Sequence, residues 1–472
     1  MQKSKEVKIC YIGGGSRNWA WVLFQDLCFE KDFSAKIELY DIDVQSARDN
    51  ETLANNLLSK HNGGRFSFHA NASLEDSLTG SDFVFISILP ADFEQMAVDV
   101  HAPEKYGIYQ SVGDTAGPGG IMRSMRAIPL YQTIAAAIQK YAPSAWVLNY
   151  TNPMTICTRA LYEAFPAIKA FGCCHEVFNT QKLLRTVLEM AGVIEKGAAV
   201  AREEIITEVA GINHFTWITK ASYKGIDIFP HYADFAEKYA ESGLEREGAP
   251  SDSVTSFGSG DHFDWRTDFF ASAERVKLDL FRRYALIAAE GDRHLAEFCP
   301  HAWYLANPKV VESWKFSLTP VSWRIENRES LKAKSAAFRN GSETLTPNQS
   351  GEEGLKIIKA LLGLGNMTTN VNLPNIGQLS GLPQGAVVET NAFFSRDNVQ
   401  PLVTKALPPA LNELVSHHVY AQEALVKAVF ARNIEEAFRV FASDLSIQTL
   451  PLHDARTLFD DMCAKTLGKS WE

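Results

Sequence analysis

Residues 171–177, FGCCHEV, place two cysteines, a histidine and a glutamate at the end of an apolar run that predicts a strand. Successive side chains on an extended segment point to opposite sides, so only one of Cys173 and Cys174 can face a given cleft. A cysteine thiolate that binds a divalent ion needs a further ligand, and the segment VAGINHFTW offers His214. The pattern indicates a metal site, although a buried cysteine and a core histidine would look the same.

A glycine turn near the start of the chain fits a dinucleotide. The run ICYIGGGS ends in Gly13, Gly14, Gly15 and Ser16, and a plausible helix follows. Glycines in such a turn let backbone amides at the helix start approach a pyrophosphate. Asn18 stands where the third glycine of G-x-G-x-x-G would be, so the motif alone also fits an ordinary strand-turn-helix.

Two later segments favour the dinucleotide. The run IELYD ends the second predicted strand in Asp41, whose carboxylate could accept both ribose hydroxyls and would disfavour a 2′-phosphate. The segment SDFVFISILPAD then supplies the small residues Ser87 and Pro90 along the expected path of the cofactor. The three segments together predict NAD rather than NADP.

Two further segments could contact a substrate. GDTAGPGGIMRSMR at 113–126 has four glycines and a proline before a predicted helix with Arg123 and Arg126. Such a loop could close over a substrate while an arginine contacts its oxygens, and a flexible connector with solvated arginines is the alternative. NYTNP ends another predicted strand and places Asn152 at the same sheet edge, although asparagine before proline also forms turns.

The stretch AAEGDRHLAEF at 288–298 concentrates Asp292, Arg293, His294 and Glu297 beside small and apolar residues. A partly buried carboxylate there could serve as a base, because desolvation raises its affinity for protons. Asp292 could equally cap the start of a helix that carries Glu297 in its first turns.

The elements that must position these residues follow from the hydrophobic pattern. Over 1–195, short β-rich runs alternate with segments long enough for crossover helices, such as 43–60 and 126–141, which predicts a Rossmann-like, doubly wound α/β domain. Over 196–472 we expect a mixed α+β lobe with helices near 350–365 and 411–442 and strands between them. An irregular stretch rich in Gly, Ser and Asp lies at 248–265.

Composition limits the partners and the location. A chain of 472 residues exceeds what one core usually holds, roughly 250–300 residues, so at least two lobes are expected. The net charge of −10 and the lack of a basic run argue against nucleic acid, and no apolar stretch is long enough for a membrane helix. Seven scattered cysteines and a start without an apolar signal core predict a reduced, cytoplasmic protein.

In their order and spacing, these segments resemble glycoside hydrolase family 4, the NAD- and metal-dependent glycosidases. The resemblance covers nearly the whole chain: YIGGGS, LYDID, GDTAGPGGIMRSMR, NYTNP, CCHEV, GINHF, GDRHLAEF and the late NVNLPNIGQLSGLP. It implies an architecture similar to that of lactate and malate dehydrogenases, a small sugar substrate, and a homo-oligomer, either a dimer or a tetramer. It also implies a divalent ion, usually Mn²⁺, bound by Cys174 and His214 with positions left for substrate oxygens.

The resemblance further implies a redox route to hydrolysis. NAD⁺ would take hydride from C3 of the sugar, the metal would stabilise the enolate formed at C2, and elimination would expel the aglycone before water and hydride are added back. Asp292 matches the base for the C2 proton, Asn152 a substrate contact, and Asp114 a carboxylate near the sugar. Glu176 and Asp114 are the candidates for the acid that protonates the leaving group.

His175 and Glu176 follow the motif cysteine, and this pairing resembles family members that act on non-phosphorylated α-glycosides. The wider pattern looks most like the α-galacturonidase type, which releases galacturonic acid from short pectin-derived α-galacturonides. We expect His175 to contact the sugar and Arg293 to bind the uronate, because a fork-shaped guanidinium suits a carboxylate. The alternatives are an α-glucosidase of the same family, a 2-hydroxy-acid dehydrogenase, and a non-catalytic NAD-sensing protein.

Overall fold

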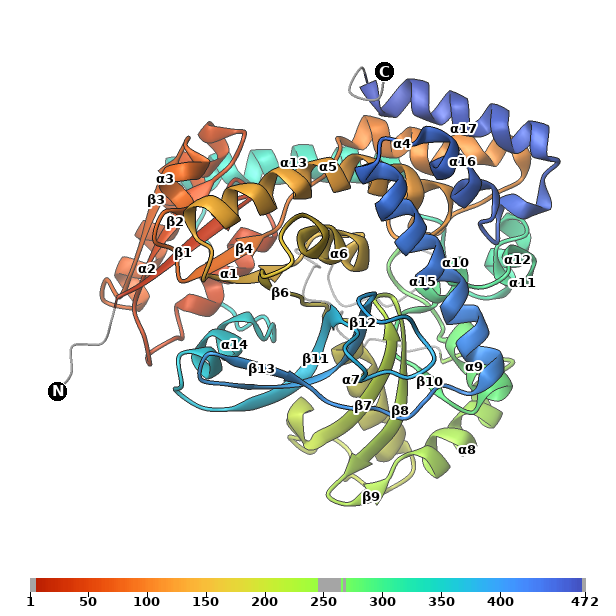
Figure 1. Cartoon of the computed structure of the whole chain (residues 1–472). Coiled ribbons are helices and arrows are strands. Elements are labelled where there is room, and N and C mark those ends of the chain that lie inside the picture. Colours follow the sequence, from red (N-terminus) through yellow and green to blue (C-terminus); the bar gives the residue numbers. More distant parts are fainter. Residues whose placement is uncertain (1–5, 245–264, 266–268, 469–472) are drawn as a thin grey trace.

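The computed structural model describes residues 6–244, 265 and 269–468. A single mixed sheet of 13 strands runs through the molecule, and helices cover both of its faces (Figure 1). The first half of the sheet is parallel, and the second half is antiparallel.

The parallel half has the topology of a dinucleotide-binding sheet. Its strands are β1 (Val7–Ile12), β2 (Ala35–Tyr40), β3 (Phe66–Asn71), β4 (Phe83–Ile86), β5 (Trp146–Asn149) and β6 (Lys169–Gly172). Their spatial order is β3-β2-β1-β4-β5-β6, with the crossover point between β1 and β4. The predicted Rossmann-like, doubly wound α/β fold is confirmed.

Helices bury both faces of this half, which explains its near-continuous apolar strands. They are α1 (Trp19–Leu27), α2 (Val44–His61), α3 (Leu74–Leu78), α4 (Phe93–His101), α5 (Gly117–Tyr141) and α6 (Met154–Ala164), with a 3-10 turn at Ala102–Tyr106. The next helix, α7 (Glu176–Met190), packs instead against the second half of the chain. Along β1, Ile9 packs in the core shared with α1 and α2, whereas Ile12 packs on the opposite face with α5 and α6. The sheet therefore separates two cores, and its carboxyl edge stays open for a ligand.

The second half of the chain adds antiparallel strands and more helices. The strands are β7 (Ile205–Ile212), β8 (Phe215–Tyr223), β9 (Ile226–Asp227), β10 (Ile287–Ala288), β11 (Met367–Pro374), β12 (Val387–Ser395) and β13 (Asn398–Pro401). The helices are α8 (Phe229–Tyr239), α9 (Arg275–Tyr284), α10 (Asp292–Phe298), α11 (His301–Tyr304), α12 (Pro308–Ser313), α13 (Val321–Asn340), α14 (Gly354–Leu361), α15 (Pro409–Phe430), α16 (Ile434–Ala442) and α17 (Leu452–Thr466), with 3-10 turns at Arg202–Glu204 and Ile447–Thr449. The mixed α+β character expected after residue 195 is present.

The two halves share one sheet. β11 pairs with β6 in antiparallel fashion at Asn372 and Gly172, and the order continues through β12, β7 and β8 to β10. The C-terminal helices α15 to α17 return to the parallel half, where they pack over α5 and α6 (Figure 1). The division into domains 1–195 and 196–472 stays a prediction.

One predicted loop is a helix. Residues 117–120 of the glycine-rich stretch form the first turn of α5, which begins earlier than the segment 126–141 indicated. A Cβ atom at Gly119 would lie 2.6 Å from the carbonyl oxygen of Gly113, and one at Gly120 would lie 2.4 Å from the carbonyl carbon of Thr115. These glycines therefore serve close packing, and the expectation that 117–120 form a closing loop was wrong.

Two other expectations concern the stretch 248–265 and membrane helices. The irregular stretch 248–265 lies outside the described residues except for Trp265. Within 6–244, 265 and 269–468, no helix has the length and apolar character needed to cross a membrane.

Candidate active site

The carboxyl end of β6 separates the two adjacent cysteines as strand alternation predicts. Cys173 packs on the face shared with α1 and α14, where it lies near the phenol of Tyr150. Cys174 is buried on the other side, and its sulfur lies within 4.8 Å of ligand atoms of both His214 and Glu290. Burial and the charges of nearby glutamates, Glu290 foremost, raise the pKa of Cys174 well above its ordinary value. A thiolate there needs a cation beside it.

His214 is held in the tight turn between β7 and β8. Only Asn213 and His214 connect the two strands, and His214 has a φ of 64°, a left-handed conformation that is uncommon outside glycine. Its Nδ1 lies 3.0 Å from the hydroxyl of Thr115, which leaves Nε2 to bind an ion. Burial, followed by the charge of His294, lowers the pKa of His214 to about 3. The neutral imidazole that results is the metal-binding form.

Glu290 is a third donor that the sequence analysis missed. It follows β10 and is fully buried, and neither of its carboxylate oxygens has a hydrogen-bond partner in the part of the chain that the structure describes. Burial and the charges of Glu389 and Glu176 raise its pKa well above the ordinary value. A buried carboxylate without a partner is costly, and a divalent ion between it, Cys174 and His214 would remove that cost. One sulfur, one nitrogen and one oxygen donor fit several divalent ions, including Mn²⁺.

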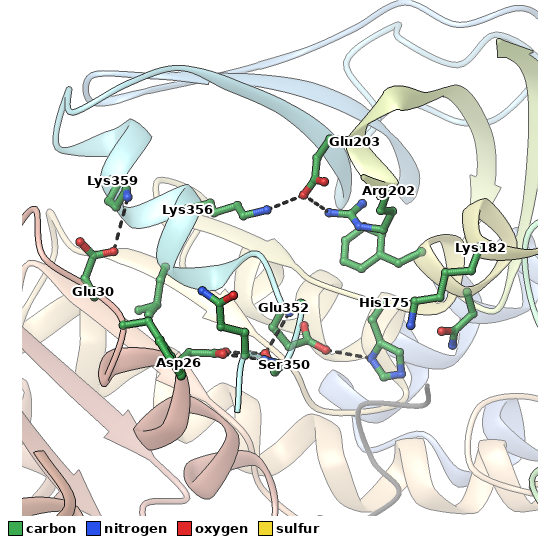
Figure 2. A pocket seen from close by; sticks show the side chains of 16 residues that line it. Asp26, Glu30, His175, Lys182, Arg202, Glu203, Ser350, Glu352, Lys356 and Lys359 are labelled. Atoms are coloured by element: carbon green, nitrogen blue, oxygen red, sulfur yellow. Dashed lines mark hydrogen bonds and ion pairs between the residues drawn. The ribbon is translucent and has the colours of Figure 1, made fainter. Parts of the chain in front are cut away.

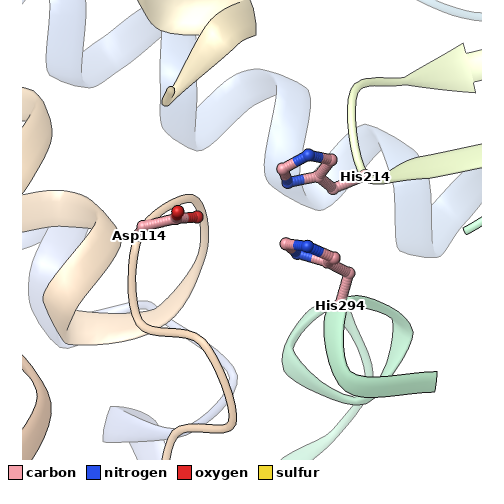
Figure 3. A group of neighbouring side chains, drawn as sticks. All are labelled: Asp114, His214 and His294. Atoms are coloured by element: carbon pink, nitrogen blue, oxygen red, sulfur yellow. The ribbon is translucent and has the colours of Figure 1, made fainter. Parts of the chain in front are cut away.

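Asp114 lies close to the same histidine. Asp114, His214 and His294 have ligand atoms within 4.8 Å of one another, and the two imidazole rings lie 3.8 Å apart (Figure 3). Burial would raise the pKa of Asp114, but the charges of Arg123, His294 and His214 outweigh it and leave the pKa well below its ordinary value. Asp114 therefore stays ionised beside the two rings. His294 was noted in the sequence without a role, and only the fold brings it here.

Glu176 and Asn152 also border this cluster. Glu176 is the first residue of α7, and the charges of His175, His294 and His214 outweigh its burial, so that its pKa is lowered. The carbonyl oxygen of Asn152 accepts a 3.0 Å hydrogen bond from Nε of Arg123. The side-chain oxygen of Asn152 is buried without a partner among the described residues. The side-chain oxygen of Asn152 therefore has the unfilled hydrogen-bonding capacity that a sugar would meet.

Asp292 and Arg293 form hydrogen bonds with other segments of the chain. One carboxylate oxygen of Asp292 accepts a 3.0 Å hydrogen bond from the backbone of Lys277 at α9, and burial followed by the charge of Glu274 raises the pKa of Asp292 to about 7. Arg293 donates to the carbonyl oxygens of two residues and to one hydroxyl, those of Ser111, Ser317 and Thr319. The predicted roles of Asp292 as the base and Arg293 as the uronate contact stay predictions. Because Glu290 lies beside Cys174, it is a second candidate for the base.

His175 faces a different space from its neighbour Cys174. Its Nδ1 lies 3.3 Å from a carboxylate oxygen of Glu352, and its ring lies 5.7 Å from that of Trp19. It lines a cavity of about 430 Å³ between α7 and α14 (Figure 2). Lys356 and Arg202 in this cavity both pair with Glu203, at 2.5 and 3.3 Å. The predicted contact of His175 with the sugar stays a prediction.

The glycine turn is built for the close approach of a ligand. Gly13 has a φ of 95°, and a Cβ atom there would lie 2.0 Å from the carbonyl oxygen of Ser87. Asp41 accepts a 2.8 Å hydrogen bond from the amide of Gly15, which locks the second strand end to the turn. No described side chain caps α1, so the amides of its first turn remain available to a phosphate.

Two more residues complete this cradle. Asn50 donates to the carbonyl oxygens of Gly14 and Ser16, at 2.8 and 2.9 Å, and no motif had indicated it. Pro90 is buried just beyond the end of β4. The turn, Asp41 and the end of β4 thus lie together at the carboxyl edge of the sheet, as a dinucleotide requires.

Known proteins resemble this chain over nearly its full length. Two family models match it: Family 4 glycosyl hydrolase over residues 8–190, and Family 4 glycosyl hydrolase C-terminal domain over residues 209–447. The chain is 51% identical over 471 residues to an alpha-galacturonidase of Thermoanaerobacter italicus, with 99% of each chain covered. It is 48% identical over 459 residues to an alpha-galacturonidase of Bacillus subtilis, with 97% of each covered.

Solved structures share the fold. The crystal structure of lplD from Bacillus subtilis has a TM-score of 0.89 and 47% identity, and 97% of this chain and 99% of that one are covered. A 6-phospho-alpha-glucosidase from gut microorganisms, in complex with NAD and Mn²⁺, has a TM-score of 0.78 and 19% identity, with 99% of each chain covered.

Proposed function

Since the chain belongs to glycosyl hydrolase family 4, we propose that it hydrolyses short α-galacturonides with NAD and a divalent ion such as Mn²⁺. The observation that carries the proposal is the buried cluster of Cys174, His214 and Glu290, whose donor atoms lie within 4.8 Å of one another. The buried carboxylate of Glu290, which has no partner among the described residues, destabilises the fold unless a cation binds beside it.

The residues present fit both groups. Cys174, His214 and Glu290 would hold the ion, while the turn at Gly13 and the carboxylate of Asp41 would hold the dinucleotide. When bound, NAD⁺ supplies a reversible hydride acceptor and the ion polarises sugar oxygens.

The remaining side chains would orient the sugar and move its protons. The unpartnered amide oxygen of Asn152 can accept from a sugar hydroxyl. Asp114 and Glu176 keep negative charge near the rings of His214 and His294. The resemblance makes each a candidate for the acid that protonates the leaving oxygen, and since its pKa is lowered, it must first take up a proton to act in this way. The base at C2 is either Asp292, as the resemblance implies, or Glu290, which faces the cluster.

Two kinds of support favour galacturonides over other α-glycosides. The relatives that match at 44–51% identity over nearly the whole chain are alpha-galacturonidases. The site also contains several buried or half-buried arginines, which suit an anionic sugar. An α-glucosidase activity is the alternative within the family. A cytoplasmic location and a dimeric or tetrameric assembly are further predictions.

The test uses reduced protein stripped of cofactor and metal. With Mn²⁺ and NAD⁺ restored, we expect release of galacturonic acid from α-1,4-digalacturonate, and omission of either should abolish it. The same protein is assayed on 4-nitrophenyl α-glucoside and α-galactoside. Cleavage that persists without NAD⁺ would contradict the redox route, and cleavage of the glucoside alone would contradict the substrate.

A further inference from the structure

Arg324 is a cation near the site that no motif had indicated. It lies in the first turn of α13, and its guanidinium sits 6.0 Å from the ring of Phe270. Its Nε is closed off from solvent and has no hydrogen-bond partner, and the structure gives this side chain no ion pair within the described ranges. Burial, the largest effect, and the charge of Arg123 lower its pKa, while Asp114 and Glu297 act in the opposite direction. Arg324 therefore lies within electrostatic reach of Asp114.

Each of the other arginines of this region already makes a hydrogen bond or an ion pair. Arg123 donates to the carbonyl oxygen of Asn152 at 3.0 Å. Arg126 forms a buried ion pair with Asp99 on the far side of α5. Arg293 donates through two of its nitrogens to protein oxygens. Among these guanidinium groups, only that of Arg324 has no acceptor in the described residues.

Arg324 is half-buried, and its Nε–H is buried without an acceptor among the described residues, which is unfavourable unless an anion completes it. The fork of an arginine matches a carboxylate through two parallel hydrogen bonds. The sugar of an α-galacturonide carries a carboxylate at C6, whereas its neutral counterparts carry a hydroxymethyl group. The ring of Phe270 faces both Arg324 and Arg293, at 6.0 and 5.2 Å, and so limits the directions in which these forks can point.

We propose that Arg324 binds the C6 carboxylate of the sugar and thereby sets the preference for uronides. The proposal rests on the proposed function and names the residue that recognises the charge. It moves this role from Arg293, whose hydrogen bonds hold α10 to the segments at Ser111 and Ser317, to a neighbour whose guanidinium has no acceptor among the described residues.

The test compares an acid with its methyl ester, which lacks the negative charge at C6. Galacturonate and its methyl ester are titrated into protein loaded with Mn²⁺ and NAD⁺, for the wild type, Arg324→Gln and Arg324→Lys. The matched control is Arg328→Gln, one helical turn further along α13, where the side chain pairs with Glu94 at the surface at 3.1 Å. Kinetics on digalacturonate accompany the titrations.

We expect the wild type and Arg328→Gln to bind the acid more tightly than the ester. In Arg324→Gln the affinity for the acid should fall about 10- to 100-fold, as loss of a hydrogen-bonded charge pair does, with the ester changed less than twofold. On digalacturonate KM should rise while kcat stays within a few fold, because the carboxylate is bound equally before and during the reaction. Arg324→Lys should recover part of the lost affinity.

Two results would overturn the proposal while leaving the proposed function intact. One is an active wild type whose preference for the acid survives in Arg324→Gln. The other is an equal loss for acid and ester in that variant, which would indicate a structural role. A wild type that releases no galacturonic acid with both cofactors present would instead refute the proposed function, and the assignment of Arg324 would fall with it.

Discussion

Replacing Glu290 with glutamine tests whether the third donor of the cluster binds the ion. The change keeps the volume of the side chain, removes one negative charge and leaves Cys174 and His214 in place. Loss of a group that only supports a metal ligand typically costs about 10- to 100-fold in metal affinity. Loss of an anionic donor that lies within 4.8 Å of both other donor atoms should cost at least about 100-fold, or about 2.7 kcal/mol.

The assay is a titration of metal-free protein with Mn²⁺, in which electron paramagnetic resonance measures the concentration of the free ion. Thermal unfolding with and without Mn²⁺ gives a second readout, because stabilisation by a ligand follows its affinity. The metal-dependent part of the stability should shrink in Glu290→Gln by up to about 2.7 kcal/mol.

The matched control for this variant is Glu389→Gln. Glu389 is equally buried, but each of its oxygens already accepts a 2.7 Å hydrogen bond, from Thr216 and Asn370 respectively. Its replacement should change Mn²⁺ affinity less than about threefold. The reasoning is refuted if Glu290→Gln binds Mn²⁺ as tightly as the wild type while Cys174→Ser loses binding.

Two more predictions concern the parallel half. Gly13→Ala should lower NAD affinity at least tenfold and the free energy of unfolding by more than about 1–2 kcal/mol, because Gly13 has a positive φ and its Cβ would meet the oxygen of Ser87. Fluorescence titration with NAD checks this against Gly80→Ala, which has a positive φ but open space, and equal effects would contradict it. Burial raises the pKa of Asp26 to about 6 against the opposing hydrogen bonds of Ser350, so the folded state holds a proton that the unfolded state releases near pH 4. The free energy of unfolding should therefore fall as pH rises from about 4 to 6, by at most about 3 kcal/mol. In urea unfolding, the Asp26→Asn variant should show a flatter dependence of this free energy on pH. An unchanged pH dependence would contradict the assignment.

Much of the fold follows from local patterns. The alternation of apolar runs and crossover helices indicated the parallel sheet, since buried parallel strands carry apolar side chains on both faces. The separation of Cys173 from Cys174 also followed from strand alternation, because it requires no knowledge of the neighbouring elements. The glycine turn and Asp41 lie close together because each follows a strand of the same parallel sheet.

The donor at Glu290 and the cation at Arg324 could not be found in this way. Glu290 and Asp292 are two residues apart, and either could face the cluster until the start of α10 is known. In the structure α10 begins at Asp292, whose carboxylate turns to the backbone of α9, while Glu290 remains on the strand end beside Cys174. Arg324 is one of several charged residues in the run SWRIENR, and only the tertiary position of α13 distinguishes it from Arg328.

The donor cluster draws its residues from both halves of the continuous sheet. Cys174 comes from the parallel half, whereas His214 and Glu290 come from the antiparallel half. The two halves meet where β6 pairs with β11 at Gly172, and a Cβ atom there would lie 2.6 Å from Met154 and 3.1 Å from the Cβ of Asn372. A small residue two positions before Cys174 thus lets the halves approach closely enough for one ion to be held by both. Binding of the ion should therefore stabilise the junction as well as the site, because donors from both halves share its charge.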